Sequence, residues 1–224
     1  MEKVLLSWSS GKDSALALYE ILRSQDYQVA ALLTTVTEEY DRVSMHGVRR
    51  VLLEQQAKAL GLPLHQVILT PDAANEEYEL RMREALLHYQ AEGVSAVVFG
   101  DIFLADLRRY REENLARMGM KAVFPLWQRD TVALIQRWLA LGFRAVTTCV
   151  DTAALGREFV GREIDQPFLA SLPATVDPCG ENGEFHSFVY DGPVFASRIR
   201  FEGGETVLRD NRFYYRDLIP VNSG

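Results

Sequence analysis

The segment Val4-Leu5-Leu6-Ser7-Trp8-Ser9-Ser10-Gly11-Lys12-Asp13-Ser14 decides the fold of this chain. An apolar run of strand length leads into a short turn of small residues, and a stretch of helical period follows from Ser14 to about Ser24. Such a turn gathers backbone N–H groups at the positive end of a helix dipole, where an anion is stabilised. Lys12 adds a full charge, and the serines add hydroxyl donors. We therefore predict a phosphate-binding loop made of Ser9, Ser10, Gly11, Lys12, Asp13 and Ser14.

Two positions of this loop distinguish it from an ordinary P-loop. A Walker-type loop has a glycine five residues before its Gly-Lys pair and a Ser or Thr after the lysine, but Leu6 and Asp13 fill those places here. In an alternative interpretation, Ser14 only caps the N-terminus of a helix. Capping explains neither Lys12 nor the serine-rich approach, so phosphate binding is the favoured interpretation.

Composition limits the class of protein. With 224 residues, 48% of them hydrophobic, the chain can bury a substantial core. Its net charge of −7 opposes a broad nucleic-acid surface, so nucleic acid is not an expected partner. Two lone cysteines, Cys149 and Cys179, and a start without the apolar core of a signal peptide predict a reduced, cytoplasmic setting. No uncharged apolar run reaches membrane-spanning length, so no membrane association is expected.

Apolar strands alternate with amphipathic helices along the first two thirds of the chain. This pattern predicts an α/β fold: a Rossmann-like open parallel sheet with helices on both faces and ligands at the carboxyl ends of the strands. We assign residues 1–150, whose last strand is 144–150, to this α/β domain, which carries the phosphate-binding loop. Residues 151–224 are expected to form a smaller α+β region that binds substrate, with short strands around a Gly203-Gly204 turn. The expected helices cover residues 14–24, 48–60, 75–91, 105–118 and 131–141.

Acidic residues form a second cluster of candidate site residues. Glu181, Asn182, Glu184 and His186 lie within six residues, on a loop that precedes an apolar strand. Carboxylates there are suited to magnesium or to accepting a proton from ammonia, although a solvated acidic turn is about equally compatible with the spacing. Gly100-Asp101 follows an apolar strand, where an open α/β sheet places ligand contacts. A helix N-cap is the competing role for Asp101.

Two further residues are weaker candidates for substrate binding. His46 lies after the second strand, at the edge where ligands are expected, although an ordinary exposed histidine is slightly favoured. Arg108 belongs to a charged helical stretch that also contains Arg109, Arg111, Glu112 and Glu113. Such a stretch usually faces solvent, but Arg108 is within reach of an acidic substrate bound near Asp101.

The loop resembles the Ser-Gly-Gly-x-Asp-Ser pyrophosphate loop of the N-type ATP pyrophosphatases, members of the adenine nucleotide alpha hydrolase-like superfamily, with Ser10 at the usual first glycine. Several further segments make nearly the whole chain similar to the diphthine–ammonia ligase (diphthamide synthase domain) family. They are Ser7–Ser14, Gly100–Ile102, Phe124–Trp127, Gly161–Asp165, Gly180–Phe185 and Tyr190–Pro193. The Cys-Gly-Glu-Asn-Gly-Glu-Phe-His form resembles a bacterial branch, in contrast to the Glu-Gly-Gly-Glu-Phe-Glu of eukaryotic and archaeal members. Bacteria are not expected to make diphthamide, so the family name does not fix the acceptor.

The resemblance implies a reaction. A substrate carboxylate attacks the α-phosphorus of Mg²⁺-bound ATP, pyrophosphate leaves into the loop, and ammonia displaces AMP to give an amide. It implies ATP and Mg²⁺ as cofactors and ammonia and a carboxylate acceptor as partners, with an oligomer possible. Catalytic roles fall to Lys12, Asp101, Glu181 and Glu184, metal binding to Asp13 and Glu184, and nucleotide contact to the loop and Gly100.

Two other functions compete with the ligase. One is a tRNA-modifying sulfurtransferase, which needs an essential cysteine and a tRNA partner. The other is a non-catalytic ATP-binding or sensor protein, which binds ATP without releasing pyrophosphate. The acidic residues of the C-terminal region favour an enzyme, because simple retention of a nucleotide does not require them.

Overall fold

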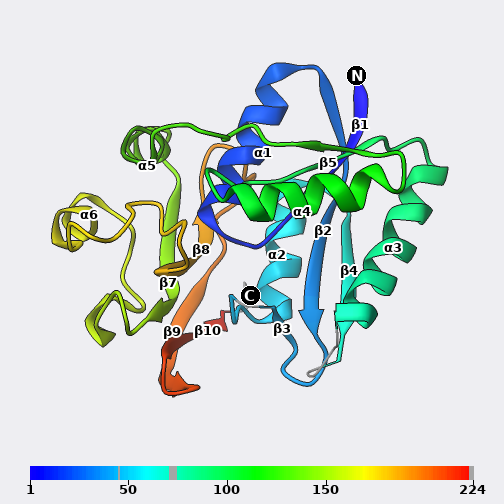
Figure 1. The fold of residues 1–224 in the computed structure, drawn as a ribbon. Coiled ribbons are helices and arrows are strands. Elements are labelled where there is room, and N and C mark those ends of the chain that lie inside the picture. Colours follow the sequence, from blue (N-terminus) through cyan, green and yellow to red (C-terminus); the bar gives the residue numbers. More distant parts are fainter. Residues whose placement is uncertain (45, 71–74, 222–224) are drawn as a thin grey trace.

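The computed structural model describes residues 1–44, 46–70 and 75–221. Its strands form two sheets, with helices between and around them (Figure 1). Within the described residues, no helix is both long enough and apolar enough to cross a membrane.

The first sheet is mostly parallel and has six strands. Its order is β3-β2-β1-β5-β6, and β4 pairs with the edge of β2 opposite to the one that pairs with β3. Every pairing is parallel except that of β2 with β3. The strands are β1 (Glu2–Ser7), β2 (Tyr27–Thr37), β3 (Arg42–Val43), β4 (Leu64–Leu69), β5 (Ala96–Val98) and β6 (Lys121–Val123). The mostly parallel sheet confirms the predicted α/β class.

Helices cover both faces of this sheet, as the wholly apolar strands predict. Side chains of β1 alternate between two hydrophobic clusters, with Val4 and Leu6 on one face and Leu5 on the other. The first cluster contains residues of α1 (Lys12–Ser24), α2 (Arg50–Leu60) and α5 (Thr131–Ala140). The second contains residues of α3 (Asn75–Ala91) and α4 (Ala105–Ala116). In Figure 1, α3 lies on the opposite side of the first sheet from the second sheet.

The second sheet is antiparallel, with the order β8-β7-β10-β9. Its strands are β7 (Arg144–Asp151), β8 (Phe185–Asp191), β9 (Phe201–Arg209) and β10 (Phe213–Pro220), and α6 (Gln166–Ser171) and a short 3-10 helix (Arg157–Phe159) lie between β7 and β8. The apolar strand at 144–150 exists as predicted, but its assignment to the parallel sheet is wrong. Its backbone pairs with β8 and β10 because those strands, distant in sequence, return beside it.

The predicted hairpin turn at Gly203-Gly204 is also wrong. Both glycines lie inside β9, and the turn is made by Asp210 and Asn211, with φ of 53° and 50°. Asp and Asn tolerate this left-handed conformation and are typical of tight hairpins. The two glycines instead let β10 side chains pack closely, since a Cβ at Gly204 would lie 3.1 Å from atoms of Asp217.

One continuous hydrophobic core joins the two sheets. The hydrophobic cluster that contains residues of α1 and α2 also contains Phe188 of β8 and Trp138 of α5, and both of these side chains are fully buried. The predicted domain boundary at residue 150 therefore remains a prediction. β7, which precedes this boundary, is already part of the second sheet. Residues 222–224 of the predicted second region lie outside the described part of the chain.

Candidate functional site

The predicted phosphate loop connects β1 to α1 at the carboxyl edge of the first sheet. The N-cap of α1 is Gly11, so the interpretation of Ser14 as the helix cap is wrong. Ser14 lies in the first turn, where its Oγ donates to the Gly11 carbonyl at 2.9 Å and lies 3.2 Å from Ser9 Oγ. The Gly11 N–H donates to Ser9 Oγ at 3.3 Å. These contacts fold the loop back on itself around the start of the helix.

Two loop positions have special backbone requirements. Ser10 has a φ of 68°, a left-handed conformation that favours glycine, and its Oγ is buried without a hydrogen-bond partner among the residues that the structure describes. At Gly11 the requirement is space. A Cβ there would lie 3.2 Å from Ser9 Oγ, 3.3 Å from the Ser187 carbonyl oxygen and 3.4 Å from His46 Nε2. The loop is therefore closely surrounded on the side of the second sheet.

Lys12 supplies a buried positive charge. Its Nζ lies 2.8 and 2.7 Å from the two carboxylate oxygens of Asp13. Burial alone lowers the pKa of Lys12, but the Asp13 carboxylate more than offsets this and holds the pKa above its ordinary value. Burial raises the pKa of Asp13, and the neighbouring charges of Asp177 and Asp101 add to that effect. An excess of negative charge therefore surrounds the lysine on this side.

The loop is held by residues far away in sequence. The Lys12 N–H donates to Ser187 Oγ at 3.1 Å, and the Val189 N–H donates to the Ser10 carbonyl at 2.9 Å. Gln56, fully buried on α2, donates to the carbonyls of Ser10 at 3.1 Å and Val189 at 2.6 Å and accepts from Trp8 Nε1 at 2.9 Å. β8 of the second sheet thus supports the loop directly.

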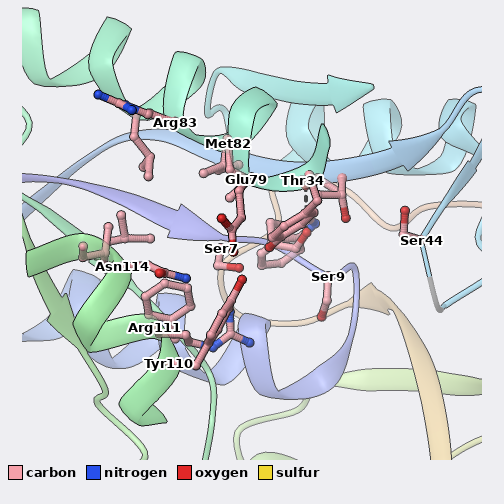
Figure 2. A pocket seen from close by; sticks show the side chains of 18 of the residues that line it. Ser7, Ser9, Thr34, Ser44, Glu79, Met82, Arg83, Tyr110, Arg111 and Asn114 are labelled. Atoms are coloured by element: carbon pink, nitrogen blue, oxygen red, sulfur yellow. Dashed lines mark hydrogen bonds between the residues drawn. The ribbon is translucent and has the colours of Figure 1, made fainter. Parts of the chain in front are cut away.

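A cavity of about 480 Å³ opens beside the residues that lead into the loop. Figure 2 shows Ser7 and Ser9 at its centre, with side chains of α3 on one side and those of α4 on the other. Aromatic and polar groups share its lining, which includes Trp8, Thr34, Tyr78, Phe99, Tyr110 and Arg111. Its volume and mixed lining suit a ligand of nucleoside size.

Gly100 and Asp101 occupy the adjoining edge, after β5. A Cβ at Gly100 would lie 2.8 Å from the Asp13 carbonyl carbon and 3.0 Å from the Ser14 nitrogen, so glycine lets the chain pass against the first turn of α1. Asp101 pairs with Arg111 of α4, with 3.0 Å between Oδ2 and Nε. The N-cap alternative for Asp101 is wrong, because the N-cap of α4 is Leu104.

Glu181 reaches this edge from the C-terminal region. One carboxylate oxygen accepts the N–H groups of Ile102 at 2.6 Å and Phe103 at 3.3 Å. Burial, together with the nearby charge of Asp13, raises the pKa of Glu181 to about 7, against the lowering effect of the Ile102 and Phe103 N–H groups and of Lys12. A carboxylate with a pKa near neutrality is suited to accepting a proton during a reaction.

Glu184, by contrast, is used inside its own loop. Its buried carboxylate accepts the N–H groups of Asp177 at 3.0 Å and Asn182 at 2.9 Å, and the Asn182 side-chain amide at 3.0 Å. These bonds give Glu184 a role in shaping the loop that carries Glu181, which differs from the predicted metal role. Asn182 is exposed and otherwise forms part of this turn.

The remaining candidates separate into two groups. His46 and His186 come together beside the loop, with ring centroids 4.5 Å apart, and His46 also lines the cavity. Arg108 lies over the rings of Phe124 and Trp127, 4.9 and 4.6 Å from their centroids, and pairs with Glu112. Arg108 does not line the cavity, whereas its neighbour Arg111 does.

No group of three or more acidic, histidine or cysteine side chains in the described residues is placed to hold a metal ion. Asp13 and Glu181 nevertheless present carboxylate oxygens, the ligand type that magnesium takes together with the phosphates of a nucleotide. Oxygens of this type fit magnesium that is held jointly with a bound polyphosphate.

Three functional side chains have no clear signal in the sequence. Gln56 lies on an amphipathic helix, Ser187 lies in a strand, and Arg111 belongs to a stretch whose other charges are typical of a solvated helix face. Only the tertiary arrangement brings them to the loop and the cavity, so sequence spacing alone does not identify them.

Comparison with known proteins identifies the family. The family model of the diphthamide synthase N-terminal domain matches residues 2–122, and that of the diphthamide synthase C-terminal domain matches residues 130–217. Similar curated proteins are named diphthine–ammonia ligase. The Schizosaccharomyces pombe protein is 28% identical over 228 residues, which cover 92% of this chain and 37% of that protein. Two vertebrate proteins are each 27% identical, those of Danio rerio (91% of this chain, 88% of that protein) and Homo sapiens (89% and 83%).

The chain thus spans little more than a third of the fission yeast protein but most of the two vertebrate relatives. The two family models together cover the phosphate loop, the cavity, the Glu181 loop and the second sheet as far as residue 217 of β10. This chain belongs to the diphthamide synthase family.

Proposed function

We propose that this chain is an ATP-dependent amide ligase of the diphthine–ammonia ligase type. It adenylates a substrate carboxylate with release of pyrophosphate and then transfers ammonia to the acyl group with release of AMP. The observation that carries the proposal is the position of the cavity, which adjoins Ser9 and therefore Lys12 at the start of α1. A nucleoside in the cavity has its phosphates at the loop.

The loop is assigned to the leaving pyrophosphate. Lys12 and the N–H groups at the start of α1 stabilise the charge that develops as the α–β bond breaks, a contribution of roughly 3–4 kcal/mol for one well-placed donor in other enzymes. When bound with the nucleotide, magnesium would neutralise charge on the phosphates, and Asp13 would hold it through a carboxylate oxygen. Asp101 is assigned to ribose or magnesium contact and is held in place by Arg111.

Glu181 is assigned to proton transfer. Ammonia is available at neutral pH mainly as ammonium, so the second step needs a group that accepts a proton. The carboxylate of Glu181 is oriented by two backbone N–H groups, which leaves its other oxygen available for this role. We assign Glu184 and Asn182 to holding Glu181 in position.

We propose that residues 151–224 contribute to the acceptor site as well as supporting the loop. Diphthine is the acceptor that the names of the relatives indicate. The acceptor of this chain, its bacterial origin, its cytoplasmic location and its oligomeric state remain predictions.

Sulfur transfer is not favoured. Both cysteines are buried, and burial raises the pKa of Cys149 and of Cys179 to about 12. A thiol that remains protonated at neutral pH is a poor nucleophile. The sensor alternative is likewise not favoured, since the similar curated proteins are named as ligases.

A nucleotide assay tests the proposal. The protein is incubated with ATP, magnesium, ammonium and a panel of carboxylates that includes a diphthine-bearing protein, and the nucleotides are separated by chromatography. AMP and pyrophosphate are expected in equal amounts with at least one acceptor. Lys12→Ala is expected to reduce this turnover by roughly 100-fold or more, and Lys58→Ala, on the exposed side of α2, serves as the matched control. Formation of ADP would overturn the proposal.

A further inference from the structure

Two imidazole rings meet beside the phosphate loop. His46 comes from the segment between β3 and α2, and His186 comes from β8 of the second sheet. Their ring centroids are 4.5 Å apart, with an angle of 42° between the planes. His46 Nε2 lies only 3.4 Å from the place that a Cβ would occupy at Gly11, so the pair directly adjoins the loop.

Burial and the charge of Lys12 keep the two rings of the pair neutral. Burial, with smaller contributions from His186 and Lys12, lowers the pKa of His46 to about 3, against the raising effect of a hydrogen bond with the Ser44 backbone. Burial and then Lys12 lower the pKa of His186 to about 4. Both rings are therefore neutral at physiological pH without a ligand. Lys12, on α1, is the charged side chain that acts on both of them.

Chemically, the pair offers what the outer part of a polyphosphate needs. Each neutral imidazole has one N–H donor, and a protonated one has two. Lys12, whose charge acts on both rings, adds a positive charge beside these donors. Charge-assisted hydrogen bonds to phosphate oxygens are about twice as strong as neutral ones.

We propose that His46 and His186 bind the terminal phosphate of the nucleotide and, after bond cleavage, the pyrophosphate. This inference rests on the proposed function and extends the phosphate site from the N-terminus of α1 to β8. It assigns the second sheet a direct part in binding ATP, beyond its support of the loop through Ser187 and Val189.

Calorimetric titration with three probes tests the pair. Pyrophosphate, ATP and AMP are titrated into the wild-type protein, into His46→Asn and His186→Asn, and into His88→Asn as a matched control, since His88 is 60% exposed on α3. Each pair variant is expected to weaken binding of pyrophosphate and ATP by about tenfold or more, with AMP unchanged. His88→Asn is expected to match the wild type with all three probes.

The contrast between pyrophosphate and AMP supplies a readout that a structural role would not move. A loss of affinity confined to pyrophosphate and ATP indicates contact with the outer phosphates, whereas a folding defect would weaken binding of all three probes. His186→Gln, which keeps a donor of similar size, guards against a folding defect.

The outcomes separate the two proposals. Wild-type affinity for pyrophosphate in both pair variants, or an equal loss for AMP, would overturn the inference and leave the ATP site intact. A wild-type protein that binds neither ATP nor pyrophosphate would overturn the proposed function together with it.

Discussion

Single residues at the loop combine functional charge with local strain. Ser10 stands where related loops have glycine, and its φ of 68° carries a cost of roughly 1–2 kcal/mol for a residue with a side chain. The resemblance to the pyrophosphate loop identifies position 10 as one that glycine usually occupies, which composition and periodicity do not. The positive φ explains this preference, because glycine adopts it without steric strain.

Replacing Ser10 with glycine is expected to stabilise the protein slightly. The strain is removed, while the greater freedom of glycine in the unfolded chain returns roughly 0.5–1 kcal/mol of the gain. The buried hydroxyl without a partner also disappears. Thermal unfolding of Ser10→Gly should show a small rise in midpoint, with ATP affinity retained. A clear fall in the midpoint would mean that the hydroxyl has a partner that matters.

Glu181 predicts the pH dependence of both turnover and stability. Its pKa is about 7 in the folded protein, above the value near 4.5 in the unfolded chain. If the ionised form accepts the proton, turnover rises as the pH passes 7, and Glu181→Gln abolishes that rise. The Glu181 carboxyl binds its proton more tightly in the folded state than in the unfolded state. Its contribution to the free energy of unfolding is therefore fully present below pH 4.5 and is lost as the pH rises through 7.

Unfolding temperatures test this pH dependence of stability. Glu181→Gln removes the charge that is costly to bury, so it should unfold at a higher temperature than the wild type at pH 8 and at nearly the same temperature at pH 5. An increase confined to pH 5 would contradict the assigned pKa shift.

At the scale of elements, the sequence predicts local structure well and pairing poorly. The expected helix at 75–91 and strand at 64–69 coincide with α3 and β4, because the spacing of apolar residues along a segment reflects its local secondary structure. The short strand β6 (Lys121–Val123) was missed, since three residues that include a lysine give little signal. β7 was placed in the wrong sheet, because an apolar strand is compatible with either sheet until its partners are known.

The α2 helix shows how an element supports the site without touching a ligand. Gln56→Leu would leave the buried Trp8 indole N–H and the Val189 carbonyl without this partner, at roughly 1–3 kcal/mol for each group. We expect urea unfolding to show that loss and ATP affinity to fall as the loop loosens. Gln55→Leu, one position earlier on α2 and only partly buried, is the control. Equal effects of the two substitutions would contradict the role of Gln56.

At the scale of the whole molecule, the two sheets are joined by their common core and by an ion cluster. Asp217 of β10 lies 2.9 Å from Arg42 of β3 and 2.6 Å from Arg49, which precedes α2. Hydrogen bonds from the Arg49 guanidinium are the main reason that the pKa of Asp217 falls to about 2. Arg42 and Arg49 lie on either side of His46 in the sequence, so their pairs with Asp217 link the second sheet to the part of the chain that carries this histidine.

Asp217→Asn is therefore expected to destabilise the protein by roughly 1–3 kcal/mol at neutral pH, the range for hydrogen bonds to charged groups. Because the folded pKa of Asp217 is depressed, this stability is present above its unfolded pKa near 4 and is lost as the pH falls towards 2. Urea unfolding at pH 7 and pH 3 measures both effects. Glu54→Gln, which breaks an exposed pair with Arg50, should change stability by less than about 1 kcal/mol. Equal effects of the two substitutions at pH 7 would contradict the account.

As with the fold, the sequence identifies the site residues that belong to local patterns but not those that depend on tertiary contacts. Ser9 to Ser14, Glu181 and the histidines are named by sequence pattern, because functional side chains concentrate in short loops of unusual composition. Gln56, Ser187 and Arg111 are not, because their roles depend on which distant elements meet. The family resemblance supplies the reaction, and the tertiary structure supplies the residues that hold its groups in place.

The most direct test of the central claim is a crystal structure of the protein with magnesium and the α,β-methylene analogue of ATP, which cannot be cleaved between those phosphorus atoms. The account predicts the nucleoside in the cavity between α3 and α4, and the β- and γ-phosphates against Ser9–Ser14 with Lys12 in contact. A triphosphate bound away from Ser9–Ser14 would contradict it.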